Sequence, residues 1–203
     1  MENSKIKLYN ETSRILRILD NSRDKPSTRA ILANIRNSIN KDSLANIEVL
    51  SFVFQNIFED FLGDKKQLND YERAIVTAVQ MYALHQQAKI ESVLKIDYED
   101  GERRQNLGDA LGSMRKKEDD NKAIDRRFNA MITSGNFDEL SHHLRQMIKL
   151  LKAKSDVKVD YASLADDLYW FLKNQKDGVK IKWSRSYYKY RKNEGENQNA
   201  KNN

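Results

Sequence analysis

The sequence predicts an all-α protein, a two-lobed helical bundle of about nine helices. Apolar residues recur at spacings of three and four through most of the chain, which places them on one face of a helix. The 203 residues include one proline and seven glycines, which is few for a strand-rich domain with many turns. A chain of this length can also bury a substantial core.

Four helices are expected in the first half of the chain. Ser27 is expected to cap the second and Asp70 the fourth, because short polar side chains accept hydrogen bonds from the free N–H groups of a first turn. Gly63 is expected to end the third, since glycine readily takes the left-handed conformation at a helix end. The predicted helices cover residues 5–19, the segment from Ser27 to Ile39, Leu44–Leu62, and about Tyr71 to Lys89.

Five further helices are expected after the charged, glycine-containing segment Asp97–Arg104, which is interpreted as the connection between two lobes, 1–98 and 104–192. Alternation of Val179, Ile181 and Trp183 leaves a short strand open as an alternative near the last helix. The polar tail 193–203 is expected to be disordered. The five predicted helices are Asn106–Lys117, Asn121–Thr133, Asp138–Ala153, Tyr161–Asn174 and Ile181–Arg191.

Positive charge is concentrated in the second half. Residues 1–101 hold 14 Lys and Arg against 15 Asp and Glu, so the remaining residues hold 22 against 15 of the totals of 36 and 30. The net charge of +6 therefore comes from the C-terminal lobe. Such an excess favours a polyanionic partner.

Several function classes find no support in the sequence. The chain has no cysteine, which excludes disulfides and thiolate sites and fits a reducing, cytoplasmic location. His85 is remote in sequence from the adjacent pair His142 and His143, which point in different directions on a helix. No glycine-rich phosphate loop or nucleophile motif is present, and no apolar run is long enough to span a membrane. We therefore expect no catalytic residue, metal or cofactor.

The clearest basic stripe lies on the predicted helix 138–153. Arg145, Lys149 and Lys152 fall on one face, apart from the apolar face that contains Leu144 and Ile148. Unpaired cations in such a row displace counterions from a phosphate chain, which is the main source of affinity for nucleic acids. The alternative is an ordinary solvated helix face.

The last helix repeats this arrangement. Lys182, Arg185 and Lys189 form a stripe opposite the aromatic residues Trp183 and Tyr187. Because the aromatic residues oppose the cations, they are expected to anchor the helix to its lobe rather than to stack on bases.

Smaller basic groups complete the predicted nucleic-acid surface. Arg127 flanks an apolar face, so an ion pair at the core edge is an alternative to a phosphate contact. Gly108 and Gly112 indicate a close approach, either of a neighbouring helix or of a nucleic-acid backbone. The remaining candidate contacts are Arg29 and Arg36, two turns apart in the N-terminal lobe, with Lys116, Lys122 and Arg126.

The C-terminal half and the segment TRAILANIRNS together resemble the CasB family, the small subunit of the type I-E CRISPR surveillance complex Cascade. Each short motif is common, but their order and spacing over most of residues 27–190 are specific. Two positions depart from the family pattern, since Asn37 and Gln146 stand where a cation is frequent. The motifs are Leu107-Gly108, Arg127-Phe128, Leu144-Arg145, Asp160-Tyr161 and the closing segment Trp183–Tyr188.

The resemblance implies a non-catalytic subunit of a large ribonucleoprotein. It implies as partners the guide RNA ribonucleoprotein, the Cascade backbone and large subunits, and a second copy of the chain. It also implies contacts with the backbones of target and displaced DNA strands, which would stabilise an R-loop in antiviral defence. The composition and the basic stripes are also compatible with two other functions: a basic scaffold that binds acidic proteins, and an RNA-associated protein.

Overall fold

The computed structural model describes residues 2–40, 47–115 and 118–199. These residues form nine α-helices and no strand, which confirms the predicted all-α fold. Short 3-10 helices lie at Ser38–Asn40 and Glu59–Phe61. The α-helices are α1 (Glu2–Asp20), α2 (Pro26–Asn37), α3 (Ile47–Asn56), α4 (Asp70–Gln86), α5 (Leu107–Gly112), α6 (Glu118–Ile132), α7 (Phe137–Lys154), α8 (Tyr161–Leu172) and α9 (Lys176–Asn199).

Capping explains where two helices begin. The Asn69 side chain accepts from the Glu72 backbone N–H at 2.9 Å, and the Glu72 carboxylate accepts from the Asn69 N–H at 2.7 Å. This capping box satisfies two N–H groups of the first turn of α4, so the cap is Asn69 and not Asp70. α2 begins at Pro26, whose fixed φ suits a first helical residue, so the expected Ser27 cap was wrong.

α3 is shorter than the predicted helix Leu44–Leu62, whose first residues lie outside the described part of the chain. The helix ends at Asn56, where the side-chain amide donates to the Phe52 carbonyl at 2.8 Å. Two residues after the end of α3, the Phe58 backbone N–H donates to the buried Glu11 carboxylate of α1 at 2.8 Å. A tertiary acceptor thus replaces the helical one and stops the helix before Gly63.

α9 contains the alternating segment Val179–Trp183, so the strand alternative is excluded. Val179, Trp183 and Tyr187 are buried at helical spacing. The helix continues to Asn199, which is inside the tail 193–203 that was expected to be disordered. Residues 200–203 lie outside the described residues.

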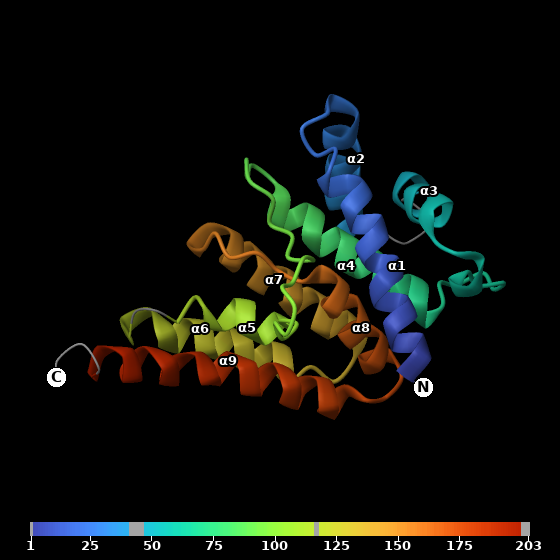
Figure 1. Ribbon diagram of the computed structural model, residues 1–203. Coiled ribbons are helices and arrows are strands. Elements are labelled where there is room, and N and C mark those ends of the chain that lie inside the picture. The colour runs from blue at the N-terminus through green and yellow to red at the C-terminus, as the bar shows by residue number, and fades with distance from the viewer. Residues whose placement is uncertain (1, 41–46, 116–117, 200–203) are drawn as a thin grey trace.

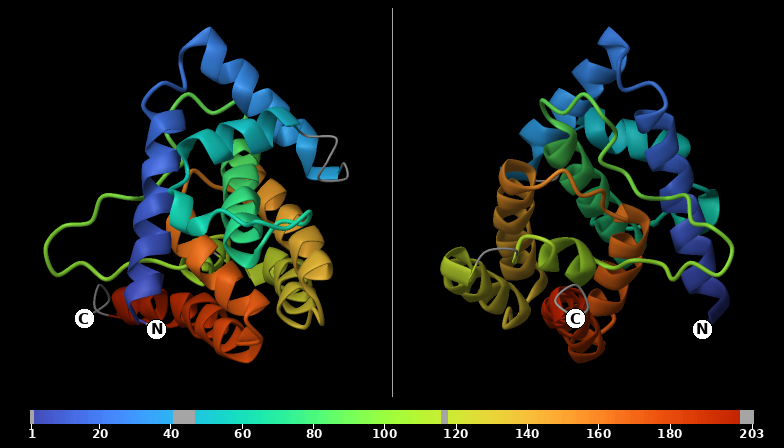
Figure 2. Two further views of the ribbon diagram at one scale, coloured as in Figure 1. Left: turned by 90° about the vertical axis from the view of Figure 1, so that its right-hand side faces the viewer. Right: turned by 60° about the vertical axis from the view of Figure 1, so that its left-hand side comes forward.

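The helices share one hydrophobic core. α8, which is buried on almost all sides, packs against α1 and α4, and α7 packs against α4 and α6. Helices from both predicted lobes therefore contribute to the same core. In both views of Figure 2, α2 lies at one end of the molecule and α9 at the other. Figure 1 shows α5 and α6 beside α9.

The connecting segment 87–106 is held at two points near its middle. Leu94 forms an isolated bridge with Val159 just before α8. Further along, the Tyr98 hydroxyl donates to Asp160 at 2.8 Å, and the Tyr9 hydroxyl of α1 donates to the same carboxylate at 3.3 Å. Burial raises the pKa of Asp160, and these hydrogen bonds partly oppose the rise. The connection is thus part of the packed structure and not a free linker.

Gly108 marks the close approach of α5 to α9. A Cβ added at this position would overlap the backbone carbonyl of Trp183. Nearby, the Asn106 side-chain amide donates to the Ser186 hydroxyl at 2.7 Å. Of the two partners that the sequence left open for this glycine, the structure shows the neighbouring helix.

Candidate nucleic-acid interface

A basic pocket of about 420 Å³ lies between α2 and the loop that follows α4. Arg29 and Arg36, two turns apart on α2, line one side, as the spacing in the sequence predicted. Lys89 lines the other side from the loop, and Arg23 comes from the connection between α1 and α2. We call this site the basic pocket.

Lys152 of α7 reaches the same loop. Its ammonium group donates to the Gln87 side-chain oxygen at 2.9 Å. Burial lowers the pKa of Lys152, and the positive charges of Arg36 and Lys89 lower it further. The structure therefore brings together cations from α2, from the loop after α4 and from α7.

Charge in the basic pocket is only partly compensated. Lys89 pairs with Asp156 at 2.6 Å, and Arg23 lies 3.9 Å from Asp20. Within the described part of the chain, no carboxylate lies within 4.0 Å of the charged groups of Arg29, Arg36 or Lys152. Burial also lowers the pKa of Arg36. Like charges that are partly removed from water repel one another, so the binding of an anion between them lowers the free energy.

Arg145 lies in a different groove. This groove of about 400 Å³ is lined by residues of α3, α4 and α7 and of the 3-10 helix after α2, and Arg73 and Gln80 of α4 are among them. Arg73 lies over the ring of Phe137 and 3.5 Å from Asp138. The stripe of α7 predicted from the sequence is therefore divided: Arg145 lines this groove, and Lys152 binds Gln87 in the loop that lines the basic pocket.

Several predicted contacts are simply exposed. Among the described residues, the predicted contacts on α6 and Lys149 of α7 form no ion pair. This includes Arg127, for which an ion pair at the core edge was the alternative. Lys116 lies outside the described residues. The exposed, unpaired members of the predicted site on α6 and α7 are Lys122, Arg126, Arg127 and Lys149.

The stripe on α9 is not uniform. The ammonium group of Lys182 lies 2.7 Å from the Asp167 carboxylate of α8, which also accepts from the Trp183 indole N–H at 2.7 Å. Its charge is therefore compensated. Arg185 and Lys189 are exposed. Trp183 is completely buried, which confirms that it anchors the helix.

Tyr187 and Arg115 belong to the interior as well. The Tyr187 ring stacks on Phe128 of α6 with centroids 3.7 Å apart. Its hydroxyl donates to Asp125 at 2.7 Å, and Arg115 binds the same carboxylate at 2.8 and 3.2 Å. This aromatic and ionic cluster joins α6 to α9. Because the Tyr187 ring is buried in it, the ring cannot stack on a nucleic-acid base.

The described residues contain neither a metal-binding cluster nor a membrane-spanning helix. No group of three or more His, Asp or Glu side chains there is placed to hold a metal ion. None of the described helices combines the length and the apolar composition that crossing a membrane requires.

The family model of CRISPR-associated protein Cse2 matches residues 31–188. The chain belongs to the Cse2 family. The resemblance to the Cascade small subunit is thereby confirmed at the level of the family. A comparison with curated protein sequences gives no match.

Solved structures of Cse2-family proteins share the fold. CasB from Thermobifida fusca is 22% identical, with a TM-score of 0.68 over 89% of this chain and 97% of that one. CasB from M. ruber is 22% identical, with a TM-score of 0.65 over 91% and 96%. A CRISPR-associated protein of the Cse2 family from Thermus thermophilus is 23% identical, with a TM-score of 0.60 over 87% and 97%.

In this Cse2-family chain, sequence reasoning missed part of the basic pocket. Arg23 and Lys89 lie in connections, where no helical spacing groups them with Arg36. Gln87, which holds Lys152, is an uncharged residue at the end of α4. Only contacts between distant segments assign these residues to the site, so no pattern in the sequence could have found them.

Proposed function

We propose that this chain is a non-catalytic structural subunit of a type I-E Cascade, which binds target and displaced DNA strands through their backbones and stabilises the R-loop. The observation that carries the proposal is that Arg29, Arg36 and Lys89 line the basic pocket, while Lys152 binds Gln87 of the same pocket lining. Membership of the Cse2 family supports the Cascade assignment.

Backbone contact fits the chemistry of this surface. Its cations neutralise phosphates of any sequence, whereas base reading needs side chains placed along a groove. R-loop formation exchanges one duplex for another of similar stability, so a few contacts to the strands shift the balance. We include Arg126, Arg127, Lys149, Arg185 and Lys189 as further phosphate contacts. Lys182 serves α9 packing through its pair with Asp167.

The test reverses charge at the pocket. Arg36→Glu combined with Lys152→Glu should weaken binding of mixed-sequence single- and double-stranded DNA by at least tenfold at low salt, because two phosphate contacts become repulsive. The matched control is Lys65→Glu with Lys66→Glu, which changes the net charge equally in an exposed loop that lines neither pocket. Equal affinity of the pocket variant and wild type would contradict the proposal.

Size analysis of the assembled complex separates the second candidate, a scaffold that binds acidic proteins. The partly compensated charge of the basic pocket also suits a carboxylate-rich partner. In that case the pocket variant would leave the complex before any change in DNA affinity appears. A marked preference for RNA over DNA of equal length would favour the RNA-associated alternative instead.

A further inference from the structure

The loop that carries Lys89 is held by one buried side chain. Gln86, the last residue of α4, is 6% exposed. Its amide nitrogen donates to the carbonyl oxygens of Lys89 and Glu91, both at 3.0 Å. Its amide oxygen accepts from the Val93 backbone N–H, also at 3.0 Å. A single side chain thus binds the loop at three points.

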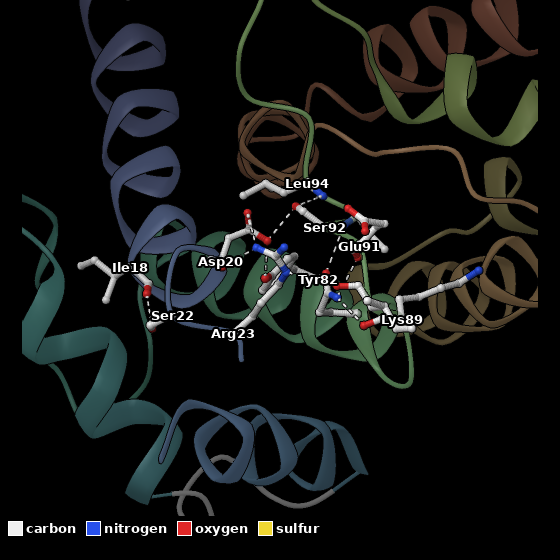
Figure 3. A network of polar contacts seen from close by, with 12 residues as sticks. Ile18, Asp20, Ser22, Arg23, Tyr82, Lys89, Glu91, Ser92 and Leu94 are labelled. Carbon is white, nitrogen blue, oxygen red and sulfur yellow. Dashed lines mark hydrogen bonds and ion pairs between the residues drawn. The ribbon is translucent and has the colours of Figure 1, made fainter. Parts of the chain in front are cut away.

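A second anchor holds the same loop from α1. The Asp20 carboxylate accepts from the Ser92 hydroxyl at 2.7 Å and from the Tyr82 hydroxyl at 2.9 Å. Arg23, which pairs with Asp20, also donates to the Ile90 carbonyl at 3.5 Å. Figure 3 shows Asp20 between Arg23, Tyr82 and Ser92.

The loop needs this support because its backbone is strained. Ala88 has a φ of 61°, in the left-handed region that residues with a Cβ disfavour. Such a conformation persists only where surrounding contacts impose it. The two residues that flank Ala88 are Gln87, which accepts from Lys152, and Lys89, which pairs with Asp156. The strained residue therefore lies between the loop residue that binds Lys152 and the loop residue that pairs with Asp156.

We propose that Gln86 is a positioning residue of the basic pocket. Its side-chain amide fixes the loop 87–93, and the Gln87 side-chain oxygen of that loop holds the Lys152 ammonium group near Arg36. The inference rests on the proposed function only in assigning DNA to the pocket. The arrangement of the cations can be measured without DNA.

The first measurement is the pKa of the Lys152 side chain, by NMR titration of its labelled ammonium group. In wild type we expect a value below the ordinary lysine range, because burial and the charges of Arg36 and Lys89 act on it. Gln86→Ala frees the loop, so the pKa should rise towards the ordinary value. The matched control is Gln80→Ala, which removes a hydrogen bond to Ser38 from the same helix, away from the pocket.

The second measurement is a double-mutant cycle on DNA affinity, using a mixed-sequence single-stranded oligonucleotide. Gln86→Ala should weaken binding about three- to tenfold in the wild-type background and have little further effect in a Lys152→Gln background, because both changes remove the same contact. For DNA affinity the control is Gln67→Ala, in the exposed loop before α4 that lines neither pocket, and it should behave as wild type. Full additivity of Gln86→Ala and Lys152→Gln, together with an unchanged Lys152 pKa, would overturn the inference.

Gln87→Ala keeps the test valid if Gln86→Ala does not fold. Gln87 is exposed, so its loss leaves the core intact but removes the oxygen that holds Lys152. Released from Gln87, the Lys152 ammonium group should move away from the charges of Arg36 and Lys89, so its pKa should again rise. An unchanged or lower value would contradict the role of the loop. If wild type fails to bind DNA, the proposed function fails, and the pKa measurement still decides the role of Gln86.

Discussion

Lys152 of α7 lies near Arg36 of α2, where burial and then the charge of that arginine hold its pKa below the ordinary lysine value. Folding normally separates like charges, since each costs desolvation and repels the other. Among the described residues, no carboxylate lies within 4.0 Å of either charged group, although Asp24 also lines the pocket, so an anion can still join these cations. This relationship is the main physical support for DNA binding by this Cse2-family protein.

The salt dependence of DNA affinity should report individual phosphate contacts. The slope of log K against log salt is negative, and replacing Arg36 by Gln should reduce its magnitude by about 1, because one fewer counterion is released. The exposed Lys149 should give the same reduction if it also meets a phosphate. Titrations at several salt concentrations measure both slopes, and Lys66→Gln serves as the control. A slope identical to wild type would remove that residue from the interface.

Lys182 and Arg185, neighbours on α9, should respond oppositely in two assays. Lys182→Gln leaves the 6%-exposed Asp167 carboxylate with the Trp183 N–H but without its cation, so stability should fall by about 1 kcal/mol. Arg185→Gln touches no packed group and should stay within about 0.5 kcal/mol of wild type. Urea unfolding measures both. DNA affinity should fall for Arg185→Gln, and a larger fall for Lys182→Gln would make Lys182 a direct contact.

Gly108→Ala should be severely destabilising. The new Cβ would overlap the Trp183 backbone carbonyl, so α5 and α9 would have to separate. Overpacking of this kind costs about 1–3 kcal/mol or more. Gly178→Ala is the matched control on α9, because nothing lies within 4 Å of the added Cβ. It should be neutral or stabilise the helix by up to about 1 kcal/mol. Thermal unfolding of the two variants compares these outcomes directly, and a Gly108→Ala protein as stable as wild type would contradict the close approach.

Stability should fall in mild acid because of His85. Burial, then Lys89 and Lys152, lower the pKa of His85 to about 4, and its Nδ1 lies 2.9 Å from the Tyr161 hydroxyl. The folded state therefore disfavours the proton that the unfolded chain binds near pH 6.5. Stability is complete above that pH and is lost progressively as the pH falls towards about 4, by roughly 3 kcal/mol.

Denaturant unfolding at about pH 7, 5.5 and 4.5 tests this dependence. His85→Gln should remove much of the decline over that range, whereas the exposed His142→Gln should retain it. An unchanged decline in His85→Gln would assign the acid sensitivity to other groups. The carboxylates of Asp97 and Asp156 are the first of these, because cationic partners lower their pKa values.

Much of the fold could be predicted because a helix and its buried face depend on the spacing of apolar residues a few positions apart in the sequence. The apolar spacing of α7 places Leu144 and Ile148 in the core, and both are buried. Trp183 and Tyr187 were expected to anchor α9, and both are buried too. The errors fell at ends of helices, such as α3, where the Glu11 carboxylate captures the Phe58 N–H and no local pattern reports it.

The sequence by itself determined the helices, the faces that pack, the positions of most cations and the resemblance to a Cascade subunit, because each depends on residues a few positions apart. Only the tertiary structure decided which cations act together. In the folded protein, Lys152 contacts the loop that contains Gln87 and Lys89, and it lies near Arg36. Lys182 pairs with the Asp167 carboxylate, and Gly108 packs against the backbone of α9. The physical reason is that charge compensation and close approach depend on distance in space, and helix packing sets that distance.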